Sequence, residues 1–512
     1  MDNLNLDTTN PENITFQYTV LDIHVLGGIR TDYLDRMRVT LKTAVAETVI
    51  PPVRHNLDLY NSTQVEKFVR LIAEKLEIGT SVIAGALHEL TNLLETYRLE
   101  IREKEREQPE QRKMLSPEEI KKYKLYLSSP NLMKRTNEDL GKCGIIGEEN
   151  NRLLMFLIFL SRKMSNPLHI ISLGSSGVGK THLQERVGAL VPDEDKLEIT
   201  TLSGNAFYYF GQHQLRNKLI LIEDLDGAEE VLYPLREIKS KKKITKTVVI
   251  KNTKGETKTV TLTVEGPVCV SGCTTKESLY EDNANRSFLI YIDESREQDE
   301  KIMDHQRAVA AGKVDRMAEQ QMIEQFQDMQ RVLQPVTIRN PYAQKLKIPT
   351  EVFKPRRTNA HYLAFIEAVT FYYQMQREKQ YDKETGEEYI ETTLEDIHEA
   401  NILMKEILLR KSDDLTGACR SYFETLKTWL KEKKGQKTFT NSQISLAFRT
   451  PLSTIKRYNL QLKESGYLKS TGLKNKGYHY EIVSYEEYEQ LKSRIGAVLD
   501  QIVEKLQKKK AA

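Results

Sequence analysis

The stretch from Pro167 to Gln184 reads PLHIISLGSSGVGKTHLQ, and the fold of the central part of the chain follows from it. Its first half is mostly apolar from Leu168 to Leu173, as expected for a buried strand. The second half contains a glycine, four residues, then Gly179, Lys180 and Thr181, and it leads into a helical sequence. A strand, a glycine-rich loop and a helix in this order predict a phosphate-binding loop.

The residue types in this loop suit a nucleotide. Glycines let the backbone turn its N–H groups around a phosphate, and the N-terminus of the following helix adds partial positive charge. We expect Lys180 to reach the β- and γ-phosphates and the Thr181 hydroxyl to bind Mg²⁺. The predicted nucleotide-binding residues are Gly174, Ser175, Ser176, Gly177, Val178, Gly179, Lys180, Thr181 and His182.

A second apolar run ends in acids, at Lys218-Leu-Ile-Leu-Ile-Glu223-Asp224-Leu-Asp226. Carboxylates at the end of a buried strand are costly unless they serve a cation or a water molecule. We assign Glu223 to the metal ion and Asp224 to the catalytic base, and the reverse assignment stays open. Asp226 is a further candidate, with capping of a turn as its simpler role.

Two more motifs follow the acids. The buried stretch from Gly266 to Thr275, GPVCVSGCTT, ends in hydroxyls, so Ser271 or Thr274 is expected to sense the γ-phosphate. A plain transition from strand to loop accounts for these hydroxyls equally well. Arg286 lies just before the next apolar strand, where an arginine can reach the phosphates of a neighbouring subunit as an arginine finger. A surface salt bridge is the alternative for an isolated arginine.

In this order and spacing, these motifs resemble an AAA+ ATPase over about residues 140 to 430. Upstream, Gly144-Ile-Ile-Gly-Glu148 resembles the adenine-contacting turn of that family, which assigns Ile145 and Ile146 to the nucleotide. The family usually has Asp before Glu, and this chain departs from it at Glu223-Asp224. The resemblance implies an α/β fold, ATP and Mg²⁺ as cofactors, and a homo-oligomer in the form of a hexameric ring.

Between the acids and Gly266, residues 246–263 carry two β-branched runs around Asn252-Thr-Lys-Gly255, which predicts a hairpin. In superfamily III and minichromosome-maintenance-like helicases, such a hairpin points into the ring pore and grips the DNA backbone. This resemblance assigns Lys254 to DNA, with Lys251 and Lys258 as helpers. A solvated surface hairpin is the plainer interpretation, because exposed lysines are common.

Downstream, Arg356 and Arg357 open a long helical sequence, and Ile390 to Leu403 continues it with an acidic helix start. This is similar to the helicase lid, in which one arginine senses the nucleotide, and the sequence does not choose between the two. The wider resemblance is to helicase modules of bacterial mobile-element primase-helicases. The chain has no zinc-ribbon cysteine cluster of the primase type, so a separate primase or replication partner is expected.

The C-terminal part reads as helix, turn, helix and hairpin over residues 434–486, which predicts a winged helix. Its second helix would place Ser453, Thr454, Lys456 and Arg457 against duplex DNA, and the wing lysines Lys474 and Lys476 would reach phosphates. Winged helices also bind proteins, so that alternative stays open.

Composition adds a few limits. The 512 residues include 76 Lys and Arg against 73 Asp and Glu, so the net charge does not indicate a partner. The longest apolar run, Leu153 to Leu160, is too short to cross a membrane, and the polar N-terminus does not read as a signal peptide. We therefore expect a cytoplasmic protein without a membrane partner.

The predicted fold class is α/β, an AAA+ P-loop core with a helical lid, an N-terminal α+β domain and a C-terminal winged helix. The expected function is that of an ATP-dependent DNA helicase in replication of a mobile genetic element. A replication initiator or loader without processive unwinding, and a winged-helix regulator with an ATPase switch, are the alternatives. The predicted boundaries are 1–110 for the N-terminal domain, 111–140 for a linker, 141–335 for the core, 336–433 for the lid, 434–486 for the winged helix and 487–512 for a C-terminal helix and basic tail.

Overall fold

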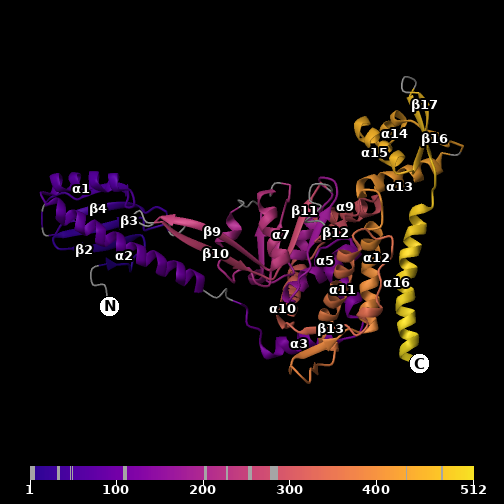
Figure 1. Ribbon diagram of the computed structural model, residues 1–512, viewed down its shortest axis with the longest axis horizontal. Coiled ribbons are helices and arrows are strands. Elements are labelled where there is room, and N and C mark those ends of the chain that lie inside the picture. Colours follow the sequence, from indigo (N-terminus) through magenta and orange to yellow (C-terminus); the bar gives the residue numbers. More distant parts are fainter. Residues whose placement is uncertain are drawn as a thin grey trace. The chain divides into compact units, whose positions relative to one another are not determined.

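The computed structural model divides the chain into two compact units (Figure 1). The first contains Met1–Arg112 and Thr245–Leu262, and the second contains Lys113–Ile244 and Thr263–Ala512. The hairpin that we predicted within the core therefore groups with the first unit. The residues that the structure describes are 6–30, 35–46, 48, 50–107, 112–200, 205–226, 229–251, 257–276, 286–433, 435–473 and 477–511.

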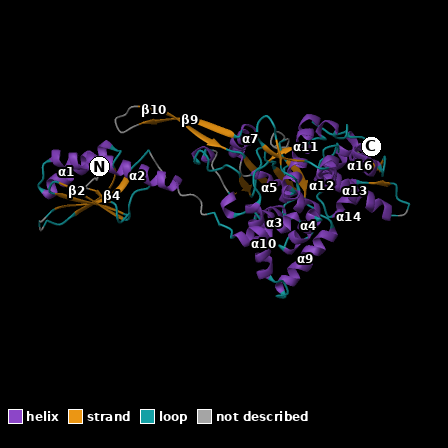
Figure 2. Ribbon diagram, turned by 90° about the horizontal axis from the view of Figure 1, so that it is seen from below, coloured by secondary structure: helices purple, strands orange, loops and turns teal. Residues whose placement is uncertain are grey.

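The first unit is an antiparallel sheet covered on one face by two helices (Figure 2). Buried and more exposed residues alternate along its central strands, which is the pattern of a sheet with one face in the core. The buried residues pack with those of the two helices in one hydrophobic cluster. The strands, in sheet order, are β1 (Leu6–Asp7), β2 (Asn13–Tyr18), β3 (Leu21–Leu26), β4 (Arg38–Val45) and β5 (Val53–Asp58), and the helices are α1 (Ser62–Leu76) and α2 (Thr80–Glu107).

The predicted DNA-binding hairpin is present as two paired strands, β9 (Lys243–Lys251) and β10 (Thr257–Glu265). The hydroxyls of Thr247 and Thr261 approach to 3.4 Å across the pair. Lys254 lies outside the described residues, and so do the side chains of Lys251 and Lys258. Their assignment to DNA stays a prediction.

The second unit is built on a five-stranded sheet in the order β12-β6-β11-β8-β7. All four pairings are parallel, so the carboxyl ends of the strands share one edge. This sheet confirms the predicted α/β class. Its strands are β6 (Ile170–Leu173), β7 (Lys196–Ile199), β8 (Lys218–Ile222), β11 (Val268–Thr274) and β12 (Phe288–Tyr291).

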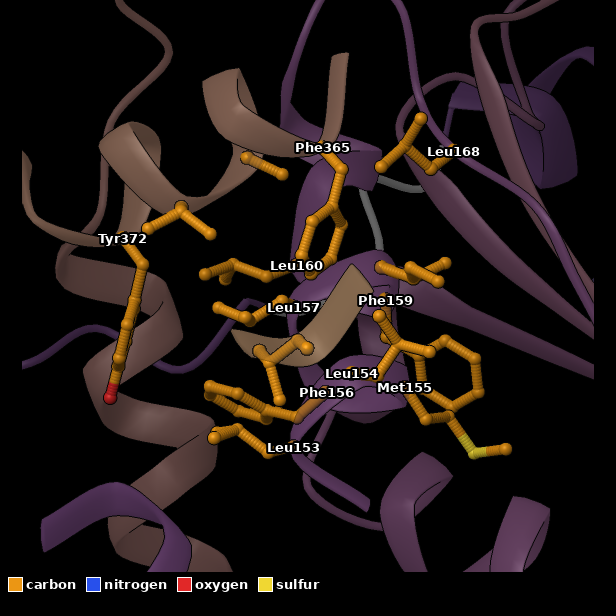
Figure 3. Packing of buried hydrophobic residues seen from close by; sticks show 14 of the residues in the cluster. Leu153, Leu154, Met155, Phe156, Leu157, Phe159, Leu160, Leu168, Phe365 and Tyr372 are labelled. Carbon is orange, nitrogen blue, oxygen red and sulfur yellow. The ribbon is translucent and has the colours of Figure 1, made fainter. Parts of the chain in front are cut away.

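Helix α5 (Glu149–Leu160) lies in the centre of the largest core (Figure 3). Every residue from Leu153 to Leu160 is buried, because the helix is apolar all round. Phe156 meets the ring of Phe326 at 5.5 Å and that of Tyr372 at 5.4 Å between centroids. Helices α6 (Lys180–Gly188) and α7 (Leu232–Lys241) also contact the sheet, and α9 (Arg296–Ala310) and α10 (Arg316–Val332) follow its last strand in the chain.

The prediction of a linker at residues 111–140 is wrong. This segment forms α3 (Pro117–Ser128) and most of α4 (Leu132–Lys142). Ser116 and Glu119 make a capping box at the start of α3, and Leu127 and Leu132 are fully buried in the core that contains α5. Only Tyr123 and Leu127 are buried in α3, and two of the five buried positions of α4 are polar, so the apolar residues show no clear helical period in the sequence.

The region predicted as a helical lid contains α11 (Pro355–Tyr372), α12 (Leu394–Arg410) and α13 (Gly417–Glu432). It also holds a small sheet in the order β13-β15-β14, so it is not purely helical. A capping box between Thr393 and Asp396 starts α12. The strands are β13 (Thr337–Arg339), β14 (Gln380–Tyr381) and β15 (Glu388–Glu391).

The C-terminal elements pair two helices with a three-stranded antiparallel sheet in the order β16-β18-β17. The last helix, α16 (Glu487–Ala511), packs on α12, where Asn401 donates to the Leu499 carbonyl at 3.2 Å. No helix among the described residues is both long and apolar enough to span a membrane. The elements before α16 are β16 (Thr438–Phe439), α14 (Asn441–Phe448), α15 (Leu452–Glu464), β17 (Leu468–Leu473) and β18 (Gly477–Ile482).

Candidate nucleotide-binding site

The sheet order brings three predicted motifs to one edge. Strand β11 lies between β6, which leads into the glycine-rich loop, and β8, which leads into the acids. Thr274 pairs with Leu173, and Gly272 pairs with Ile222, so the three strands end close to the same level. Strands β7, β8 and β11 lie on one side of β6 in the sheet, and β12 lies on the other side. In open α/β sheets, ligands bind at the carboxyl end of the strand where the chain changes sides in this way.

The loop between β6 and α6 has the backbone shape that its glycines allow. Gly177 and Gly179 have φ angles of 84° and 95°, in the left-handed region that other residues rarely adopt. A Cβ added at Gly174 would lie 2.9 Å from a methyl group of Val178, so this position also requires glycine. The loop therefore folds back over itself and ends at the first turn of α6.

Lys180 is 8% exposed and points back over the loop, where its Nζ donates to the carbonyls of Gly174 at 2.8 Å and Ser175 at 2.5 Å. Thr181 follows it and hydrogen-bonds with the buried thiol of Cys273. An ammonium, a hydroxyl and the N-terminus of a helix form a donor set that fits a polyphosphate with Mg²⁺. The remaining predicted residues, Ser176 and His182, are exposed, and Val178 is half-buried.

The acids Glu223 and Asp224 follow β8, and both are exposed at this edge. The Glu223 N–H donates to the Ile199 carbonyl at 3.2 Å, which extends the strand by one residue. Asp224 accepts from the N–H of Asp226 at 2.8 Å. Burial raises the pKa of the Cys273 thiol to about 12, and both Lys180 and Asp224 act on that pKa, so both charges lie near Cys273.

The two predicted sensor residues have different surroundings. Ser271 is fully buried and donates to Gln184 Oε1 at 2.7 Å, so the structure does not bring its hydroxyl to the edge. Thr274 ends the strand and donates to Asp226 Oδ1 at 2.6 Å, and Thr275 donates to Asp226 Oδ2 from its hydroxyl at 2.8 Å. Burial acts to raise the pKa of Asp226, but these hydrogen bonds lower it below its usual value. Asp226 therefore ties the ends of β8 and β11 together.

Sequence reasoning missed Gln184. Its side chain is 2% exposed, and Nε2 donates to the Ile222 carbonyl at 3.0 Å while Oε1 accepts from Ser271 and from Cys273 at 3.6 Å. It thus connects the helix that starts at Lys180 to both neighbouring strands. The signal that could have found it is its position one helical turn after Lys180, on the same face of α6.

The turn that resembles an adenine-contacting segment is held from two sides. Arg152 donates from Nη1 to the carbonyls of Ile145 at 2.8 Å and Gly147 at 3.2 Å. Gln298 donates from Nε2 to the Ile146 carbonyl at 2.9 Å. Ile145 is buried and Ile146 is half-buried. The sequence did not indicate Arg152 or Gln298, because neither belongs to a motif.

Arg286 lies at the other edge of the sheet. It precedes β12, whose first residue Phe288 pairs with Ile170 at the start of β6, whereas the glycine-rich loop follows the end of β6. Its Nε donates to the Ser240 hydroxyl on α7 at 3.1 Å. The structure therefore separates Arg286 from the loop of its own chain, as required for a finger that acts on a neighbour.

The second-sensor candidates Arg356 and Arg357 are exposed in the first turn of α11. One turn further along this helix, His361 stacks on Phe288 with 5.2 Å between ring centroids. Burial, then Lys411 and Arg357, lower the pKa of His361 to about 3, so Arg357 is near this ring. Helix α11 therefore starts close to the edge that carries Arg286.

The predicted duplex-binding residues lie on α15. Ser453, Lys456 and Arg457 are exposed, and Thr454 is half-buried. Ile455 and Asn459 form the buried side of the helix, and Asn459 accepts from the Tyr422 hydroxyl at 2.8 Å. Lys474 and Lys476 lie outside the described residues.

Comparison with known proteins agrees with this geometry at the level of the domain. The MTBMA_p00010 P-loop domain family matches residues 132–335, the part of the chain that contains the parallel sheet. No curated protein matches the sequence. The chain thus contains a P-loop domain, a class of nucleotide-binding fold.

Among solved structures, the chain is similar to a full-length MCM homolog from Methanopyrus kandleri, with 11% identity, 72% of this chain and 75% of that chain covered, and a TM-score of 0.28. It is also similar to the A-form apo structure of the NrS-1 C-terminal region, with 11% identity, 73% and 76% covered, and a TM-score of 0.21. With TM-scores this low, neither likeness bears on what this chain does.

Proposed function

We propose that this chain is an ATP- and Mg²⁺-dependent AAA+ ring motor, and specifically a DNA helicase in the replication machinery of a mobile genetic element. The proposal rests on one arrangement in the sheet. The carboxyl edge gathers Lys180, Thr181, Glu223, Asp224 and Thr274, while Arg286 lies at the opposite edge. A chain with the two halves of a hydrolytic site on opposite edges completes the site only by meeting another copy.

Within one chain, the loop residues hold the phosphates. Lys180 would donate to the β- and γ-phosphate oxygens, and Thr181 would supply an oxygen ligand for Mg²⁺. Bound Mg²⁺ supplies charge neutralisation at the phosphates. Of the two acids, Glu223 would hold the metal ion and Asp224 would polarise the attacking water, with the reverse assignment as the alternative. Thr274 ends the strand between the glycine-rich loop and the two acids, and it orients the water or senses the γ-phosphate.

Arg286 of a neighbouring copy stabilises the charge that develops on the transferred phosphoryl group. Arg356 or Arg357 serves as the second sensor, and the position of α11 near Arg286 favours a contact with the neighbour's nucleotide as well. The homo-oligomer, a hexameric ring, follows from this requirement for a partner copy.

DNA contacts are assigned to two regions. Lys251, Lys254 and Lys258 of the β9–β10 hairpin grip a single strand in the pore, and phosphate contacts of this kind are independent of sequence. The exposed side chains Ser453, Lys456 and Arg457 of α15, with Thr454 and the wing lysines Lys474 and Lys476, hold duplex DNA. A separate primase supplies primers.

ATP hydrolysis with and without single-stranded DNA, measured beside fork unwinding, tests this proposal. Lys180→Ala should lower ATP turnover by about 100-fold or more, because the phosphates lose their main cation. Lys254→Ala should leave hydrolysis in place but uncouple it from unwinding. Lys347→Ala, an exposed lysine outside both regions, is the matched control and should behave as wild type.

The outcomes separate the candidate functions. Hydrolysis that DNA stimulates, together with unwinding that requires Lys254, supports the helicase. Turnover of ATP while forks stay paired replaces it with the initiator or loader. A wild-type chain that never hydrolyses ATP excludes a motor.

A further inference from the structure

One short segment touches both ends of the candidate nucleotide site. Residues 293–298, which follow β12 and include the first turn of α9, contact the glycine-rich loop through Glu294 and the 144–148 turn through Asp293 and Gln298. We infer that this segment is a clasp that sets the spacing between the phosphate-binding loop and the base-binding turn, with Glu294 and Gln298 as its positioning residues. The inference rests on the proposed function, in that ATP is taken to bind between these two sites.

At the phosphate end, Glu294 accepts two hydrogen bonds from one residue of the loop. The Ser175 N–H donates to Oε1 at 3.0 Å, and the Ser175 hydroxyl donates to Oε2 at 3.3 Å. A Cβ on Gly174 would lie 3.3 Å from Glu294 Oε1, so the carboxylate approaches the start of the loop closely. A carboxylate that accepts from a backbone N–H forms a strong, directional bond, which fixes where the loop leaves β6.

At the base end, the clasp makes two contacts. Gln298 is 3% exposed and donates to the Ile146 carbonyl at 2.9 Å. A Cβ on Gly147 would lie 1.9 Å from Gln298 Oε1, so the side chain presses directly on the backbone of the turn. The Asp293 N–H donates to Glu148 Oε1 at 2.7 Å. The direction of the Ile146 carbonyl, and thus the polar edge offered to a base, depends on Gln298.

The clasp is short and internally braced, so both of its ends are held in fixed positions. Ser295 caps α9 by accepting from the Gln298 N–H at 3.2 Å, and its own N–H donates to Asp293 Oδ1 at 2.8 Å. Because the segment is fixed in place, Glu294 and Gln298 each act on the part of the site that they contact. Glu294 should therefore govern affinity for the phosphates, and Gln298 should govern affinity for the base.

Binding of three probes separates the two ends. ATP carries both parts, inorganic tripolyphosphate lacks the base, and adenosine lacks the phosphates. Glu294→Ala should lower the affinity for ATP and for tripolyphosphate by about 10-fold, the effect of one lost charge-assisted hydrogen bond. Its affinity for adenosine should stay within about 2-fold of wild type. Glu294→Gln keeps an acceptor for the Ser175 N–H and should restore tripolyphosphate binding to within about 3-fold of wild type.

The base end is tested with Gln298→Met, which keeps the volume of the side chain and removes its donor. This variant should lower the affinity for ATP and for adenosine by about 10-fold and leave the affinity for tripolyphosphate within about 2-fold of wild type. Where this variant fails to fold, Gln298→Asn serves, because its amide is one methylene too short to reach Ile146. Glu297→Gln, an exposed neighbour in the same turn of α9, is the control.

Thermal unfolding without ligand accompanies each variant. Equal losses for all three probes in both variants would mean general damage to the domain and would overturn the clasp, as would wild-type binding in both. The proposed function fails separately, when wild type binds ATP but neither hydrolyses it nor unwinds DNA. In that case the binding pattern of the variants still decides the clasp.

Discussion

The two edges of the parallel sheet differ in the charges that they carry. At the carboxyl edge, Lys180 donates to loop carbonyls, and Asp226 accepts from Thr274 and Thr275. At the amino edge, three cations contact neutral groups: Arg286 donates to Ser240 at 3.1 Å, Lys239 to Ser287 at 3.4 Å, and Lys411 approaches His361 at 3.5 Å. Charged groups of both signs thus lie at the carboxyl edge, whereas these three groups at the amino edge are all cations.

The pKa values follow this difference. Burial lowers the pKa of both Lys239 and Lys411 to about 8, with the charge of Arg286 adding to the effect at Lys239. Glu237 on α7 is the acid that feels the charge of Arg286, and it pairs with Lys241 at 2.6 Å. Within the described part of the chain, Arg286, Lys239 and Lys411 make no ion pair with a carboxylate.

In the proposed function, the carboxyl edge binds the phosphates of the chain's own nucleotide, and the amino edge meets an anion from another molecule. The amino edge carries positive charge that costs energy to keep half-buried and that an incoming anion would stabilise. The phosphates of a nucleotide on a second copy are the anion that the proposed ring supplies.

The largest effect is expected from Arg286→Ala. Turnover of ATP should fall by about 1,000-fold while ATP affinity stays within about 3-fold, because an arginine finger acts on the transition state. Arg70→Ala, an exposed arginine of the first unit, is the control. Mixing Arg286→Ala with Lys180→Ala should restore part of the activity. In mixed oligomers, Arg286 of the Lys180→Ala variant can act on the nucleotide that the intact loop of the Arg286→Ala variant binds. A mixture that stays inactive, with weak ATP binding by Arg286→Ala, would make the amino edge part of the same chain's site.

The next largest effects distinguish the roles of the two acids at the carboxyl edge, Glu223 and Asp224. The variant that removes the catalytic base should lower turnover by about 100-fold or more with ATP binding intact. The variant that removes the metal acid should raise the Mg²⁺ concentration needed for half-maximal activity. We expect the first behaviour from Asp224→Asn and the second from Glu223→Gln. The opposite pattern would reverse the assignment, and a full rate in both would remove these acids from the mechanism.

A smaller effect tests how the carboxyl edge is held together. Gln184→Leu removes the hydrogen-bond partner that Gln184 provides to the Ser271 hydroxyl and the Ile222 carbonyl in the core. The free energy of unfolding should therefore fall by about 2 kcal/mol. Urea denaturation measures this, with Glu185→Leu at an exposed site of the same helix as the control. Stability equal to wild type would show that the two strands do not depend on this bridge.

The smallest effect concerns the unmatched charge at the amino edge. A folded-state pKa of about 8 for Lys411 means that folding disfavours its protonated form. The penalty is full below pH 8 and fades as the pH rises toward the unfolded value of about 10.4. Lys411→Met should therefore stabilise the protein by about 1 kcal/mol at pH 7, after allowance for solvent, and by less at pH 10. Lys505→Met, at an exposed position of α16, should show no such trend. A loss of stability that grows with pH would contradict the unmatched charge.

Local features of the site could be predicted directly from the sequence. The strand before Gly174, the left-handed glycines and the position of Lys180 at the start of a helix depend on near neighbours, whose backbone preferences the residue types express. The acids after β8 were predictable for a similar reason, because a buried apolar run seldom ends in paired carboxylates unless a cation or a water molecule uses them. The prediction for residues 111–140 was wrong, because two of the five buried positions of α4, Thr136 and Asp139, are polar and hide the helical period in the sequence.

Which residues meet across the fold was not predictable in this way. Glu294 lies 119 positions from Ser175, and Ser271 lies 87 positions from Gln184, and no local pattern marks either pair. The separation of Arg286 from its own loop likewise depends on the strand order, with β12 beside β6 and running parallel to it. The residue types alone specify a phosphate-binding loop, because the required backbone shape is local. The clasp, the hydrogen bonds of buried Gln184 and the different charges of the two sheet edges arise only in the folded chain. Contacts between residues distant in sequence depend on how the strands are ordered.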